Sequence, residues 1–111
     1  SRGLGDVYKR QDTPVPQRLL KKKLADTSLR LRQLREELKV AEEQLTHFAD
    51  EADEARLRSL VSETPLADQK HREANKHAES MRKHKNMLQN EIERVEALQD
   101  ELLDQMESKN D

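Results

Sequence analysis

The sequence predicts an all-α protein in which two long helices form an antiparallel coiled-coil hairpin. Three observations support this fold class. Apolar residues recur at heptad spacing through both halves of the chain, a proline-containing turn separates the halves, and mirrored segments carry opposite charge. Together they predict one elongated domain over residues 17–109, with a line of contact between two helices in place of a globular core.

The first helix is expected over about residues 17–61, after a short extended lead-in at residues 12–16 (DTPVP) whose prolines do not fit a helix interior. Apolar or small residues then alternate at spacings of four and three for more than the three or four repeats that make a coiled-coil pattern specific. These positions are Leu20, Leu24, Thr27, Leu31, Leu34, Leu38, Ala41, Leu45, Phe48, Ala52 and Ala55.

A turn is expected at residues 62–64. Pro65 has no backbone N–H and disfavours helical geometry at Thr64, so the first helix should stop before Thr64. Proline is well tolerated in the first turn of a helix, and Thr64 is a good N-cap. Asp68 adds a negative charge near the positive end of the new helix dipole.

The second helix is expected over about residues 65–108 and carries the same alternation, at Ala74, Ala78, Met81, Lys85, Leu88, Ile92, Val95, Gln99, Leu102 and Met106. When the two series are folded against each other, the residue numbers of each facing pair add up to 126. Leu34 then faces Ile92, and Leu31 faces Val95. The centre of the hairpin falls at residue 63, inside the turn that Pro65 predicts independently.

Charge favours the same arrangement. Residues 17–40 carry a net charge of +5 and their mirror segment, 86–109, carries −5; residues 41–61 carry −4 and residues 65–85 carry +3. A parallel dimer of one extended helix would place +5 against +5. Exposed ion pairs contribute only about 0.2–1 kcal/mol each, so the pattern selects orientation more than it adds stability.

The line where the helices meet, called the seam below, should vary along the rod. Thr27 opposite Gln99 is interpreted as a polar layer that fixes the register. Towards the turn the seam residues become small, and the acidic cluster at residues 50–54 is expected to face the basic stretch from Lys70 to Lys85. At the tip, four apolar residues are expected to close the seam while remaining partly exposed: Leu57, Leu60, Val61 and Leu66.

Composition narrows the function. The chain has no cysteine, so disulfide and thiol chemistry are excluded, and a reducing, cytoplasmic location is expected. No nucleophile–base arrangement or phosphate-binding glycine loop is present, and we expect no enzyme activity and no cofactor. Residues 12–111 have a net charge of −4, which argues against nucleic-acid binding, and no apolar run is long enough for a membrane span. The four histidines lack the i, i+4 spacing of metal ligands, and His47 is expected to point away from the others.

Two stretches resemble known sequences. Ser1 to Gln11 (SRGLGDVYKRQ) resembles the translated read-through of a transposase-type sequencing adapter, which implies a non-native scar and a true N-terminus that lies elsewhere. The stretch from Leu60 to His84 (LVSETPLADQKHREANKHAESMRKH) resembles short uncharacterised coiled-coil proteins of actinobacterial type. This second resemblance implies a bacterial source and a coiled-coil fold but brings no activity.

These features favour an adaptor, spacer or scaffold that works through protein–protein contacts, either with another protein or in a dimer of hairpins. The expected partner-binding residues are apolar and gather at the open end: Leu19, Leu98, Leu103 and Met106. The alternative is a regulator that inserts an acidic tip into a larger machine, as transcription factors entering the RNA polymerase secondary channel do. The tip residues would then be Asp53, Glu63 and Leu66.

Overall fold

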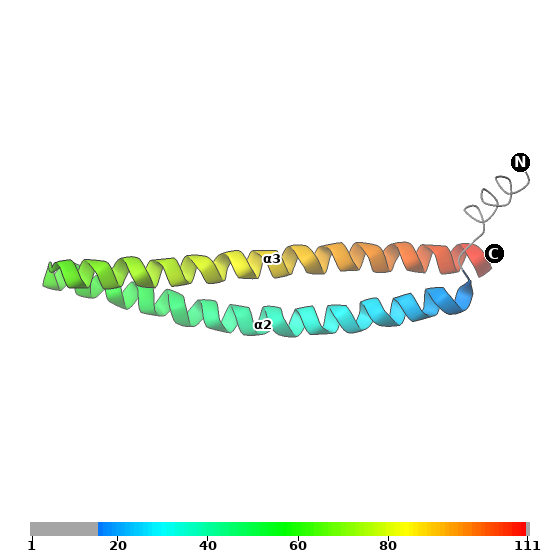
Figure 1. The fold of residues 1–111 in the computed structure, drawn as a ribbon, viewed down its shortest axis with the longest axis horizontal. Coiled ribbons are helices and arrows are strands. Elements are labelled where there is room, and N and C mark those ends of the chain that lie inside the picture. The colour runs from blue at the N-terminus through cyan, green and yellow to red at the C-terminus, as the bar shows by residue number, and fades with distance from the viewer. Residues whose placement is uncertain (1–15, 111) are drawn as a thin grey trace, which may run out of the picture.

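The computed structural model describes residues 16–110 and contains two long helices over that range. Helix α2 spans Gln17–Ser62, and helix α3 spans Pro65–Asn110. The helices run antiparallel and lie side by side, so that the start of α2 and the end of α3 are at the same end of the rod (Figure 1). The predicted antiparallel hairpin is thus confirmed. The adapter-like residues 1–11 and most of the predicted lead-in lie outside the described residues.

The turn consists of two residues, and its backbone hydrogen bonds explain why it is so tight. The backbone N–H of Ala67 donates to Thr64 Oγ1 at 3.2 Å, which is the N-cap that the sequence predicts for α3. At the end of α2, Glu63 adopts the left-handed conformation (φ 51°, ψ 36°), and its N–H donates to the carbonyl oxygen of Ser59 at 3.0 Å. Glycine or asparagine usually occupies such a position. A side-chain bond from Ser59 to Asp68 ties the two helices together across the turn.

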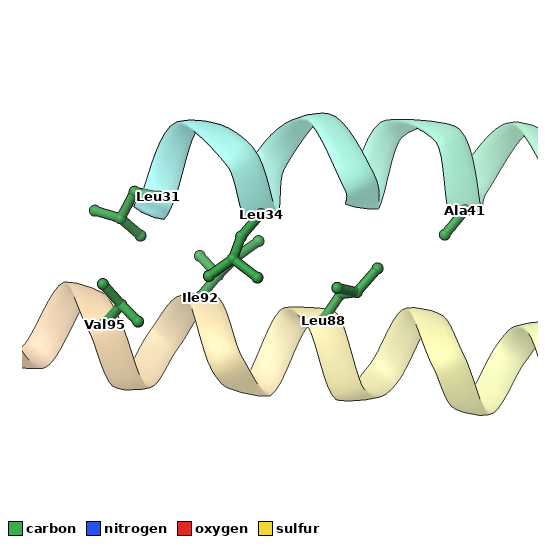
Figure 2. Packing of buried hydrophobic residues seen from close by; sticks show 6 residues of the cluster. All are labelled: Leu31, Leu34, Ala41, Leu88, Ile92 and Val95. Atoms are coloured by element: carbon green, nitrogen blue, oxygen red, sulfur yellow. The ribbon is translucent and has the colours of Figure 1, made fainter. Parts of the chain in front are cut away.

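The predicted heptad positions form the seam. All 21 residues of the two alternating series are buried or half-buried, and Leu20 and Leu34 have almost no exposed surface. The central cluster interleaves side chains from both helices, with Leu31 beside Val95 and Leu34 beside Ile92 (Figure 2). These neighbours are the pairs that the mirror around residue 63 predicts. The register of the hairpin therefore follows from the heptad pattern.

The tip of the seam differs from the prediction. Leu57, Leu60, Val61 and Leu66 do not close it, because they are between 56% and 84% exposed. The half-buried residues there are Ser59 and Ala67. Ser59 lies four residues after Ala55, so it continues the heptad series, whereas the four larger side chains fall outside that series. The prediction was wrong because it ranked apolar character above heptad position.

The polar layer of Thr27 and Gln99 lies in the seam as predicted, but the two side chains do not bond to each other. Thr27 is buried, but its hydroxyl donates to the carbonyl oxygen of Leu24 in its own helix at 2.9 Å. Gln99 reaches past Thr27, and its Nε2 donates to Ser28 Oγ at 3.0 Å. The link between the helices at this level is therefore Gln99–Ser28. A buried threonine hydroxyl on a helix can satisfy itself locally, which frees the longer glutamine to bond at the edge of the seam.

Candidate interaction surfaces

The seam has two flanks, which differ in the side chains they present. On the arginine flank, defined by Ser28, Arg35 and Glu96, the Arg35 guanidinium contacts the Glu96 carboxylate at 3.1 Å across the helices. The opposite side, the histidine flank, carries His77 and His84 on α3. There His84 lines a groove of about 290 Å³ together with Val40 and Gln44 of α2. The two flanks therefore offer different chemistry to a partner.

Charge matching between the helices acts mostly without direct contacts. Of the ion pairs that residues 16–108 form within 4.0 Å, only Arg35–Glu96 crosses between the helices. The acidic cluster at residues 50–54 pairs within α2 instead: Glu51 contacts His47 and Glu54 contacts Arg58. The cluster does face the basic stretch of α3, since Asp53 lines one groove with Lys76 and Arg82, but none of these ion pairs joins the two. Neighbours at i+3 or i+4 are closer than residues across a seam of small side chains.

Glu91 and Arg94 form a close i, i+3 ion pair on α3. The hydrogen bond from Arg94 lowers the pKa of the Glu91 carboxyl, and the positive charges of Arg94 and Arg30 lower it further. The same hydrogen bond raises the pKa of Arg94. Arg30 is on α2, so part of this electrostatic effect on Glu91 comes from the other helix.

Two of the four histidines lie beside Phe48, the aromatic plug of the seam. Phe48 stacks on His77 across the helices, with ring centroids 5.7 Å apart, and the ring of His47 lies 5.6 Å from Phe48. His47 thus contacts Phe48, its neighbour in the chain, and the expectation that it points away from the other histidines stays a prediction. Its Nε2 is 3.1 Å from Glu51 Oε1. Within residues 16–110 no group of three His, Asp or Glu side chains is placed to hold a metal ion.

The four residues predicted at the open end are not equivalent. Leu19, Leu98 and Leu103 are between 41% and 44% exposed, whereas Met106 is half-buried in the seam. Leu98 and Leu103 are five residues apart, which is about 140° around a helix. Leu98 lies seven residues after Glu91, and Leu103 lies seven after Glu96, so the two leucines are on opposite flanks. The open end thus exposes apolar side chains in several directions.

The predicted tip residues are also separated. Glu63 is exposed at the apex of the turn, and Leu66 is 61% exposed beside it. Leu66 lines a pocket of about 200 Å³ together with two basic residues, Arg58 and Lys70. Asp53 lies ten residues before Glu63, or about 15 Å along α2. Glu63 is therefore separate from the acidic cluster that contains Asp53.

Sequence reasoning missed three exposed apolar residues in the middle of the rod: Leu29, Val40 and Met87, which are 52%, 48% and 68% exposed. Leu29 is on the back of α2, two residues from the seam residues Thr27 and Leu31. Val40 and Met87 are on the histidine flank. Assigning a heptad position to each apolar residue outside the seam would have found them. Val40, for example, lies three heptads after Leu19 and therefore on the same face of the helix.

The fold and these surfaces define a class: a two-helix coiled-coil hairpin with apolar side chains left outside its seam. No protein-family model, no curated protein and no solved structure matches this chain. Among the described residues, neither helix combines the length and apolar character needed to cross a membrane.

Proposed function

We propose that this chain is a non-enzymatic, cytoplasmic adaptor or scaffold that works through protein–protein contacts along a straight rod. Each helix has 46 residues, which corresponds to a rod about 69 Å long. The observation that carries the proposal is the set of large apolar side chains outside a seam that is already filled. An exposed leucine by itself needs no explanation, but several at separate levels of a rod suit contacts at separate points.

The open end supports this function most directly. Leu98 and Leu103 remain more than 40% exposed even though the seam between them is closed by the buried Leu102. More than half of the surface of each residue is covered by the hairpin, and the remainder is free to contact a partner. A partner protein that covered both flanks of this end would remove them from water, which is worth about 25 cal/mol per Å² of apolar surface.

The test is site-specific photo-crosslinking in cells of the native host, with the crosslinking residue placed at Leu103. The proposal predicts adducts of a few defined masses. When the crosslinking residue is placed at Leu19 instead, its adducts should disappear in the double variant Leu98→Glu, Leu103→Glu. The same crosslinker at Leu29, on the back of α2, is the matched control. Equal adducts from Leu103 and Leu29, or none from either, would contradict the proposal.

A second function, insertion of the tip into a larger machine such as RNA polymerase, is favoured by one observation. Glu63 holds a left-handed conformation that costs a non-glycine residue about 1–2 kcal/mol. Such strain concentrates at functional positions. The test is charge reversal at Glu63 and Asp53 with transcription output as the readout. Unchanged polymerase binding and output would eliminate this alternative.

A further inference from the structure

We infer that the histidine flank is the docking surface for a second copy of this chain, which lies antiparallel to the first. The inference rests on the proposed function, because it names the partner for one of the surfaces. Its central residues are Val40 and Met87. Val40 lines the groove that contains His84, and Met87 follows His84 by three residues, so both side chains are on this flank.

Apolar residues recur along the same flank at a fixed spacing. Leu19, Val40 and Val61 are separated by 21 residues each, and Leu66 and Met87 are also separated by 21. A spacing of three heptads returns a side chain to the same face of a coiled-coil helix. All five are between 41% and 84% exposed. The flank therefore carries three evenly spaced apolar stations: Leu19 at the open end, Val40 with Met87 in the middle, and Val61 with Leu66 at the tip; Leu98 lies on the same flank between the first two.

The equal spacing makes the flank complementary to itself. The stations are about 31 Å apart at 1.5 Å per residue. A two-fold axis at the level of Val40 places the middle station against its own copy. The same axis places Leu19 of one copy against the tip station, Val61 and Leu66, of the other. Closed two-fold dimers of this kind are the commonest form of homo-oligomer.

The charges on the flank select the antiparallel orientation over the parallel one. A parallel pair of hairpins would place Arg30 opposite Arg94, Glu37 opposite Glu91, and two further like-charged pairs near the tip. The antiparallel pair places Arg30 opposite Glu51 of the second copy, and Lys70 opposite Glu101. It leaves two like-charged contacts, Lys23 with Arg58 and Asp26 with Glu54. Attractive and repulsive charge contacts are therefore equal in number in the antiparallel arrangement, whereas the four contacts described for the parallel arrangement are all repulsive.

The available area is large enough for a stable dimer. One face of a rod about 69 Å long and two helices wide, at about 10 Å per helix, has on the order of 1,400 Å². A specific interface needs about 800 Å² per partner. The groove of about 290 Å³ beside Val40 gives the centre of this face a concave site for a side chain of the second copy.

The first test is the solution mass of the full 111-residue chain by light scattering over a dilution series. We expect twice the chain mass of 13.0 kDa. The double variant Val40→Glu, Met87→Glu should be monomeric with unchanged helical circular dichroism, whereas the matched control Leu29→Glu should remain dimeric. A monomeric wild-type chain, or dissociation by Leu29→Glu as well, would overturn the inference.

The second test fixes the orientation and does not depend on charged substitutions. Since the chain has no cysteine, single cysteines can be introduced and oxidised. Val40→Cys should form a disulfide with itself, and Leu19→Cys should crosslink when mixed with Val61→Cys. The parallel arrangement places α2 of one copy against α3 of the other, so a disulfide between Val40→Cys and Met87→Cys in a mixture of the two variants, with none between Leu19→Cys and Val61→Cys, would contradict the inference. If the chain is a monomer but still yields adducts with other proteins from Leu103, the dimer is refuted and the proposed function stands. If the chain is a dimer but yields no such adducts, the dimer stands and the proposed function is refuted.

Discussion

Replacing Leu34 by alanine should destabilise the hairpin far more than the same replacement at Leu29. Leu34 is 1% exposed at the centre of the seam, while Leu29 on the same helix is 52% exposed. Leu→Ala removes three carbon atoms, worth about 2.4 kcal/mol at about 0.8 kcal/mol per buried carbon. The helices can close part of the gap, so the cavity contribution should be small, and we expect about 2–3 kcal/mol in total. At Leu29 we expect less than about 0.5 kcal/mol.

The assay is urea unfolding of both variants, followed by circular dichroism at a protein concentration where the oligomeric state has been measured. Leu34→Ala should lower the unfolding midpoint while leaving the slope with urea unchanged, because the surface exposed on unfolding is nearly the same. If the two variants differed by less than about 0.5 kcal/mol, Leu34 would not be a seam residue and the register of the hairpin would be refuted.

Three further predictions concern the turn and the surface. Glu63→Gly should raise the free energy of unfolding by about 0.5–1 kcal/mol, because glycine adopts φ > 0 without steric cost; a lower urea midpoint would contradict the left-handed turn. Thr64→Ala should cost about 1 kcal/mol through loss of the cap to the Ala67 N–H, while Thr64→Ser should retain most of it in the same assay. Glu91→Gln should make the free energy of unfolding depend less on pH in acid. Arg94 lowers the pKa of Glu91 in the folded state, so the ionised carboxylate stabilises the fold above its unfolded-state pKa. This stabilisation is lost as the pH falls through the lowered folded-state pKa. Identical acid profiles for the variant and the wild type would refute that assignment.

The fold could be predicted from the sequence because one simple pattern determines it. Heptad spacing fixes which face of each helix is buried, and Pro65 fixes where the chain reverses, so Leu34 has to meet Ile92. The left-handed backbone of Glu63 could not be predicted in this way. A two-residue connection forces that conformation on whichever residue follows the helix, and glutamate gives no signal for it.

The surfaces were harder to predict, because side chains outside the seam obey no single pattern. The exposure of Leu98 and Leu103 follows from their positions beside the seam, but their separation onto opposite flanks requires the helix geometry. Local partners, Glu51 and Phe48, decide where the exposed side chain of His47 points. Such choices depend on rotamers and on contacts a few residues away.

The measurement that tests the hairpin most directly is the distance between spin labels at residues 29 and 97 of one chain, introduced as cysteines and diluted with unlabelled protein. Both positions are exposed and lie at the same level of the rod. The antiparallel hairpin, with helix axes 8–10 Å apart, predicts a label separation below about 40 Å. One continuous helix through residues 29–97 would place the labels about 100 Å apart, and that result would contradict the fold.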